Sequence, residues 1–203
     1  MNVGGCWETV GMREPLESLG QDLQQARAAW AGALPPFDAA GLGVADVSRQ
    51  VESMSDAGLV RTTEAVARLV RDAEAVLARV AGEVSRRSAV GLGKDGLAKR
   101  QGFANPAKLI ATATGGAVAG AVKLVAVGEA TAPRQSLTGE RIPAAHPHVA
   151  AGLAAGSVSV DAAAAITAML DRVARRADPV QAEQVEWILA QRAPCCRSIC
   201  CCV

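Results

Sequence analysis

The sequence predicts an all-α protein, an irregular bundle of about six to eight helices of which one is long and several are short. Two observations lead to this fold class. Half of the 203 residues are hydrophobic and only 2% are aromatic, and an alanine-rich, aromatic-poor composition favours closely packed helices over a sheet. Several stretches repeat apolar residues at three- and four-residue spacing, and none alternates convincingly with the period of a strand.

The first helix is expected to begin at Pro15, because proline suits the first helical position, and to end before Pro35 and Pro36. Residues 1–13 are expected to be disordered, residues 38–43 to form a linker, and a short helix can follow around residues 44–52. Residues 1–54 are therefore interpreted as a leader with one amphipathic helix. Its apolar stripe consists of Leu16, Leu19, Leu23, Ala26 and Trp30.

The longest helix is expected over residues 55–88, with Ser55 as its N-terminal cap. About thirty residues make roughly 45 Å of helix. The apolar spacing is close to a heptad repeat, which leaves two interpretations open: an ordinary long core helix, or pairing in a homodimer through this helix. The stripe consists of Leu59, Val66, Val70, Ala73, Leu77, Val80 and Val84.

Three short helices are expected after a glycine-containing break, over residues 97–101, 106–114 and 118–127. Asn105 can cap the second, with Pro106 at its first position. The second and third, joined by a turn at residues 115–116, resemble the outline of a helix-turn-helix. Residues 132–148 contain three prolines and are expected to form a loop.

Two helix starts stand out between residues 143 and 190. Ser159 can cap one helix, and Asp178 can cap the last one, with Pro179 at its first position. Before them, Gly156 is expected to end a short helix over residues 149–155. The apolar stripe of the helix between the two caps consists of Ile166, Met169, Leu170, Val173, Ala174 and Ala177.

Three stretches together resemble a known bacterial family. They are residues 95–103 (Asp-Gly-Leu-Ala-Lys-Arg-Gln-Gly-Phe), residues 137–143 (Leu-Thr-Gly-Glu-Arg-Ile-Pro) and the region 143–190, which opens with Pro-Ala-Ala-His-Pro-His. In their order and spacing they are similar to domain-of-unknown-function family 222, which usually forms the N-terminal half of HNH endonucleases of high-GC bacteria. The resemblance implies a helical, non-catalytic domain over residues 55–190. In relatives, further helical domain and then the nuclease module follow where this sequence departs, at about residue 191.

Basic charge is concentrated in the middle of the chain. The whole sequence carries a net charge of +1, but residues 94–141 hold seven Lys or Arg against three Asp or Glu. Such cations could contact phosphates without reading bases, because the third short helix offers Lys123 as its one long polar side chain. The alternative is a helical hairpin packed in the core and surrounded by solvated cations. The candidate nucleic-acid contacts are Lys94, Lys99, Arg100, Lys108, Lys123, Arg134 and Arg141.

No catalytic, cofactor-binding or metal site is predicted, and no small-molecule substrate is identified. His146 and His148 are the only histidines, and no Cys, Asp or Glu adjoins them in the sequence to complete tetrahedral metal ligation. They are interpreted as part of a helix entry fixed by Pro147. The longest uncharged apolar run, residues 109–122, is shorter than the roughly twenty residues of a membrane span, so no membrane association and a cytoplasmic location are expected.

Residues 191–203 contain five of the six cysteines and are interpreted as an aberrant tail written by a frameshift or truncation. Adjacent cysteines place their sulfurs awkwardly for zinc. The function predicted from the sequence is a non-catalytic helical N-terminal domain of a truncated HNH-endonuclease-like protein, which assists non-specific DNA association through its basic segment. The alternatives are a helical oligomerisation or protein-interaction module and a non-functional remnant.

Overall fold

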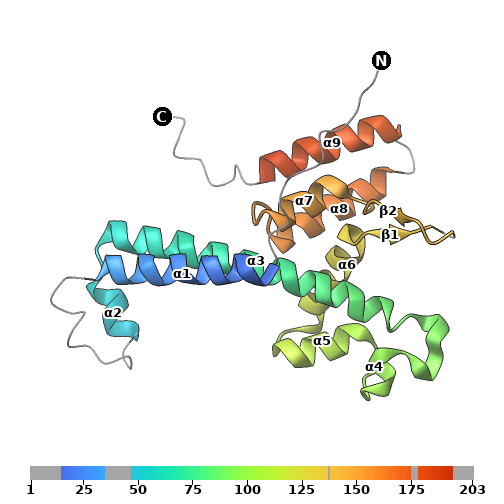
Figure 1. Ribbon diagram of the computed structural model, residues 1–203, viewed down its shortest axis with the longest axis horizontal. Helices are drawn as coiled ribbons and strands as arrows, with labels where there is room; N and C mark the ends of the chain where they lie inside the picture. Colours follow the sequence, from blue (N-terminus) through green and yellow to red (C-terminus); the bar gives the residue numbers. More distant parts are fainter. Residues whose placement is uncertain (1–14, 35–46, 137, 175–177, 194–203) are drawn as a thin grey trace. The chain divides into compact units, whose positions relative to one another are not determined.

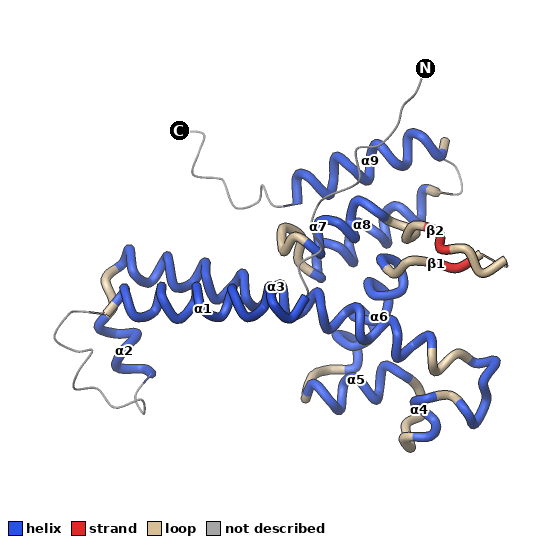
Figure 2. Tube along the Cα trace, viewed as in Figure 1, coloured by secondary structure: helices blue, strands red, loops and turns tan. Residues whose placement is uncertain are grey.

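The computed structural model describes residues 15–34, 47–136, 138–174 and 178–193. Within these ranges the chain forms nine α-helices, one 3-10 helix and two very short strands, and the all-α prediction is confirmed. Figure 1 shows the elements in chain order, and Figure 2 colours them by type. The expected disordered start, the linker at residues 38–43 and residues 194–203 of the predicted tail lie outside the described residues. Residues 191 and 192, which were assigned to that tail, instead end the last helix.

The chain divides into two compact units, residues 1–70 (unit 1) and residues 71–203 (unit 2). The domain boundary predicted from the sequence lies before the long helix, whereas the boundary between the two units lies inside that helix. Unit 1 contains α1 (Pro15–Ala33), α2 (Val47–Ser53) and the first part of α3 (Asp56–Arg86). The hydroxyl of Ser55 accepts a hydrogen bond from the N–H of Gly58 at 3.2 Å, which confirms the predicted cap of α3.

In unit 1, α1 and α3 pack side by side in opposite directions. At one end of the pair, a Cβ placed on Gly58 would lie 2.8 Å from the Cβ of Ala33, so the two backbones approach closely there. Toward the other end, Nε of Arg68 lies 3.0 Å from Oδ1 of the buried Asp22. On α1, Nε1 of Trp30 donates to the side chain of Gln50 on α2 at 2.8 Å, which ties α2 to this pair.

Unit 2 continues α3 and adds a run of short helices. Two-residue strands interrupt the predicted loop at residues 132–148 and pair as a small antiparallel hairpin, which the sequence analysis missed because two residues are too few to show alternation. The elements after α3 are η1 (Val90–Asp95), α4 (Leu97–Arg100), α5 (Pro106–Thr114), α6 (Val118–Thr131), β1 (Arg134–Gln135), β2 (Arg141–Ile142), α7 (Pro147–Ala154), α8 (Val160–Val173) and α9 (Pro179–Arg192).

Two apolar clusters form the core of unit 2. The larger one joins α3, α6, α7 and α8 around Val127, Val149 and Val158, which are almost fully buried. The smaller one packs Ala81 of α3 against Ile110 of α5, together with alanines from α5 and α6. Both clusters rely on small side chains, as the alanine-rich composition predicted.

The crossing of α3 and α6 explains why the apolar stripe predicted for α3 is wrong in part, although its member Val84 does pack against the smaller cluster. A Cβ on Gly82 would lie 2.7 Å from the carbonyl carbon of Gly128, so the two helices touch backbone to backbone. Such an approach requires small residues, and the bulky Val80 is accordingly left 53% exposed. The residues of α3 that unit 2 buries are Asp72, Ala75, Ala78, Ala81 and Gly82.

The other local predictions are confirmed in part. Asn105 caps α5, and Ser159 caps α8 by accepting from the N–H of Ala162 at 3.2 Å, as expected. Asp178 precedes α9, but its side chain makes no capping hydrogen bond. The stripe predicted for α8 is half right: Ile166 and Leu170 are buried, whereas Met169 and Val173 are exposed because Val160, Ala163 and Thr167 occupy the inner face instead.

No single helix in the described ranges is long and apolar enough to cross a membrane. The pair α5 and α6 reaches that length and composition only when taken together, and its two helices are bent by 116° at the break between them.

Candidate functional site

All seven predicted basic contacts are exposed, and four of them come together at one end of unit 2. Lys94 lies on η1, Lys99 and Arg100 on α4, and Lys108 in the first turn of α5. Two further arginines, which were not among the predicted contacts, lie beside them: Arg86 ends α3 and Arg87 follows it. Figure 1 shows this end of α3 with α4 and α5, and we call residues 83–108 the basic cap.

Backbone hydrogen bonds hold the basic cap together. The N–H of Leu97 donates to the carbonyl of Arg87 at 2.8 Å, and the N–H of Ala98 donates to the hydroxyl of Ser88 at 3.0 Å. Ala98 is almost fully buried, so it anchors α4 to the end of α3 while Lys99 and Arg100 point into solvent. The cap holds six Lys or Arg against two Asp or Glu.

Glu83 partly neutralises the basic cap. Its carboxylate accepts hydrogen bonds from Nε and Nη2 of Arg86, at 2.7 and 2.6 Å, and from Nε of Arg87 at 2.6 Å. The hydrogen bonds from Arg86, followed by those from Arg87, lower the pKa of Glu83 to about 2, and the same contact raises the pKa of Arg86. Between η1 and the first turn of α5, the four lysines and arginines form no such ion pair with a carboxylate, and their side chains are exposed to solvent.

The remaining three predicted contacts lie elsewhere in unit 2. Lys123 on α6 forms an ion pair with Asp161 on α8. Nε of Arg134 donates to the backbone carbonyl of Pro143 at 3.1 Å. In the hairpin register Arg134 faces Ile142, so Arg134 and Arg141 project from opposite faces of the hairpin. The structure therefore does not gather these three with the basic cap.

The helices α5 and α6 have the angle of a helix-turn-helix but not its chemistry. They cross at 116° over a turn that begins with Gly115 in the left-handed conformation, φ 65°. The exposed residues of α6 include Val118 and Val122. Lys123, its single long cation, is occupied by Asp161. A helix that reads bases needs several Arg, Lys, Asn or Gln side chains, so this pair has no base-reading surface.

A second polar cluster surrounds His146. Its imidazole is buried between two carboxylates that the sequence places far away: Nε2 lies 3.2 Å from Oδ1 of Asp171 on α8, and Nδ1 lies 3.6 Å from Oε2 of Glu186 on α9. Glu186 is itself buried, and its Oε1 accepts from the N–H groups of His148 and Val149 at 2.8 and 3.0 Å. A side chain from α9 thus caps the first turn of α7.

This cluster has a structural explanation. The backbone N–H of His146 donates to the carbonyl of Ala130 at the end of α6, 3.2 Å away. Together with the contacts to Asp171 and Glu186, this bond ties α6, α7, α8 and α9 to one residue. In the described ranges, no three His, Cys, Asp or Glu side chains converge as metal ligands. Asp171 and Glu186 could not be predicted as partners of His146, because nothing in the local sequence marks a partner so distant in the chain.

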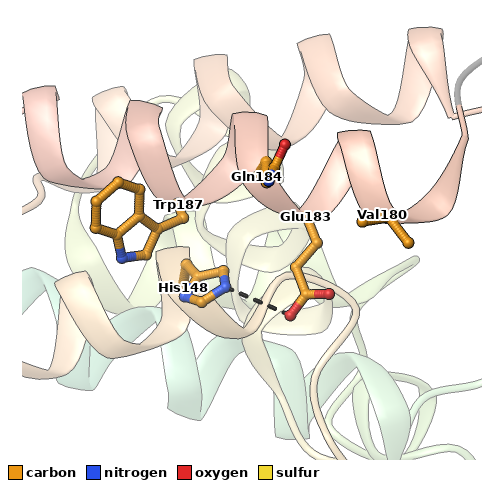
Figure 3. Close-up of a pocket in the computed structure, with 5 residues that line it drawn as sticks. All are labelled: His148, Val180, Glu183, Gln184 and Trp187. Atoms are coloured by element: carbon orange, nitrogen blue, oxygen red, sulfur yellow. Dashed lines mark ion pairs between the residues drawn. The ribbon is translucent and has the colours of Figure 1, made fainter.

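Next to this cluster is a shallow hollow of about 220 Å³ between α7 and α9 (Figure 3). Nε2 of His148 lies 3.8 Å from Oε1 of Glu183 along one side, and the indole of Trp187 borders the other. Val180 and Gln184 complete the lining. The hollow is open and contains no serine, threonine or cysteine that the histidine could activate, so the arrangement has no nucleophile–base pair.

Comparisons of the chain with protein-family models, with curated proteins and with solved structures find no match.

Proposed function

We propose that this chain is a non-catalytic helical domain of the cytoplasm that associates with nucleic acid through its basic cap, as an accessory to a nuclease of the HNH type. The observation that carries the proposal is the cap itself, in which six exposed Lys and Arg are held together by backbone bonds and only Glu83 is seen to offset any of them. The resemblance to domain-of-unknown-function family 222 supplies the connection to a nuclease.

The chemistry of the basic cap fits phosphate better than bases. Lys99, Arg100 and Lys94 lie on short elements at the surface and can each approach a phosphate oxygen, and the positive dipole end of α5 lies beside Lys108. The absence of a base-reading helix among α5 and α6 favours binding without sequence preference. DNA is the expected partner because of the nuclease connection.

Salt-dependent binding to a random DNA duplex tests this proposal. Binding through phosphates releases counterions, so the logarithm of the binding constant should fall linearly with the logarithm of the salt concentration, by about 0.9 per phosphate contact. The double variant Lys99→Ala/Arg100→Ala should reduce that slope by about 2. The matched double variant Arg134→Ala/Arg141→Ala removes two predicted cations outside the basic cap and should leave the slope unchanged.

A variant that strengthens binding provides an independent check. Glu83→Gln removes the carboxylate that occupies Arg86 and Arg87, so both guanidinium groups become available to phosphate. We expect tighter DNA binding and a steeper salt dependence. Equal binding by this variant and the unmodified chain would show that the end of α3 does not contact the nucleic acid.

The alternatives from the sequence make different predictions in the same experiments. A helical oligomerisation or protein-interaction module would self-associate or bind a partner without retaining DNA, and a non-functional remnant would do neither. We also propose that the chain alone does not hydrolyse DNA. Hydrolysis of plasmid DNA in the presence of divalent metal, abolished by His146→Ala or His148→Ala, would contradict that proposal.

A further inference from the structure

The described part of unit 1 buries little apolar surface. In its described ranges, residues 15–34 and 47–70, the buried apolar side chains are Ala26, Ala33 and Met54. Larger aliphatic side chains are left outside: Leu16 is 70% exposed and Leu23 is 48% exposed. Apolar surface left in water forgoes about 25 cal/mol per Å², so a helix pair with such a thin core gains stability from anything that covers it. The exposed aliphatic residues of unit 1 are Leu16, Leu23, Val47, Val51, Val60, Val66 and Val70.

Four of these residues lie on one side of the α1–α3 pair. On α1 the side chains that face α3 are those of Asp22, Ala26 and Ala33, and Leu23 is rotated roughly 100° from Asp22. On α3 the inward residue is the buried Thr62, which bonds to the carbonyl of Ala29 at 3.4 Å. Successive residues of antiparallel helices turn in opposite senses when viewed from one end. The flank of α1 that holds Leu16 and Leu23 is therefore on the same side as the flank of α3 that holds Val66 and Val70. We call these four residues the open face.

One end of the same side is already covered. Trp30 is seven residues beyond Leu23 and therefore on the same flank of α1, and its indole is bonded to Gln50 of α2. α2 itself leaves Val47 and Val51 exposed. The open face thus continues from the end covered by α2 toward the start of α1.

We propose that a second copy of this chain covers the open face. The observation that points to a copy is the symmetry of the apolar positions. Leu16 and Trp30 are equally distant from Leu23 along α1. The ion pair between Asp22 and Arg68 sets residue 68 level with residues 22–23, so Val66 and Val70 are equally distant from that same level along α3.

The contacts become self-complementary when a two-fold axis passes through this level, perpendicular to the helices and in the plane between the two open faces. Leu23 would pack on Leu23 of the second copy, and Val66 on Val70 and the reverse, as an isologous interface requires. Leu16 would reach the α2 end of the second copy. Arg27, the cation beside the open face, would fall opposite residues 19–20, which carry no charge. The two helix pairs would form a four-helix arrangement. This proposal does not depend on nucleic-acid binding.

Residue 23 provides a direct test because it would meet its own copy at the axis. The full chain is studied in the presence of a reductant, since it contains six cysteines, and its mass is measured by sedimentation over a concentration series. A dimer has twice the 20.7 kDa of the chain. Leu23→Glu and Leu23→Lys, each alone, would oppose like charges at the axis and should weaken dimerisation more than about tenfold. An equal mixture of the two variants should regain the dimer.

The control is Gln25→Glu, which places a charge on the other flank of α1 and should leave the dimer unchanged. Circular dichroism verifies that each variant keeps its helices, and Leu16→Glu replaces the residue 23 variants if they do not. An unmodified chain that stays monomeric throughout the series overturns the proposal and leaves the open face to another segment of its own chain or to a different protein. A Leu23→Glu dimer as tight as the unmodified one, or a mixture that stays monomeric, overturns it as well.

Discussion

The contact between Gly82 and Gly128 makes a quantitative prediction about stability. In the variant Gly128→Ala, the new Cβ would lie 2.7 Å from the backbone nitrogen and 2.9 Å from the Cα of Gly82, and it would also press on the carbonyl oxygen of Ala78. Cβ atoms in proteins essentially never approach other heavy atoms within 3.0 Å. Because every obstacle is backbone of α3, α6 must move away from α3, and the core around Val127 must move with it.

The magnitude follows from two opposing effects. Replacing glycine by alanine inside a helix gains about 1 kcal/mol through conformational preference. Overpacking a close-packed core costs about 1–3 kcal/mol, and more where backbone must shift. We therefore expect Gly128→Ala to lower the free energy of unfolding by about 2 kcal/mol, which for a chain of this size lowers the Tm by roughly 4–8 °C.

The same helix supplies the control. A Cβ on Gly120 would meet nothing within 4 Å, so Gly120→Ala should retain the helical gain and raise the free energy of unfolding by about 0.5–1 kcal/mol. Thermal and urea unfolding, followed by far-ultraviolet circular dichroism, compare the two variants with the unmodified chain. If Gly128→Ala proves as stable as Gly120→Ala, the helices do not touch backbone to backbone, and the account of the α3–α6 crossing is refuted.

Three further predictions concern single side chains. Glu186→Ala removes the acceptor of two N–H groups of α7 and should lower the free energy of unfolding, measured with urea, by about 2–4 kcal/mol. If the free energy of unfolding falls no more than it does for a substitution at an exposed site, Glu186 is not needed as the cap of α7. Asn105→Ala removes the cap of α5 and should cost about 1 kcal/mol, visible as a lower Tm with unchanged secondary structure. Because the pKa of Glu83 is depressed to about 2 from an ordinary 4.5, its contribution to stability is present above pH 4.5 and is lost as the pH falls through about 2. The carboxyl carbon shift followed by NMR should titrate near the lower value, and in Arg86→Ala or Arg87→Ala it should titrate at higher pH.

The sequence predicts local structure well where a residue acts on its own backbone. Ser55, Asn105 and Ser159 were recognised as caps because a side-chain oxygen just before a helix needs only the N–H groups of the next turn. Gly115 was recognised as a turn because glycine readily takes the left-handed conformation that it has here, φ 65°. These predictions depend only on residues that are neighbours in the chain, and the structure confirms them.

Packing was harder to predict because the sequence does not reveal which face of a helix meets a partner. On α3, hydrophobicity favoured Val66 and Val80, whereas the inner face is made of alanine, glycine and two polar residues. Small residues were selected by the need for Gly82 to meet Gly128, a requirement set by a helix more than forty positions away. Hydrophobic ranking alone could not reveal it.

Of the candidate nucleic-acid surface, the sequence identified the charges but not their grouping. Net charge over a window joined Lys123, Arg134 and Arg141 to the basic cap, although two of them have protein partners and the third lies on the hairpin. The same window began after Arg86 and Arg87, which only the fold brings beside α4. Both errors arose because contacts between segments that are distant in the sequence determine which of these charges lie together.

The position of Glu186 has a consequence for any attempt to shorten the chain. A polypeptide that stopped before α9 would lose the acceptor of the first N–H groups of α7 and would leave His146 facing only Asp171. Water would then enter where α6, α7 and α8 meet, far from the cut itself. The last described helix is thus part of the smallest piece that can fold cooperatively, and limited proteolysis that releases it should melt its neighbours as well.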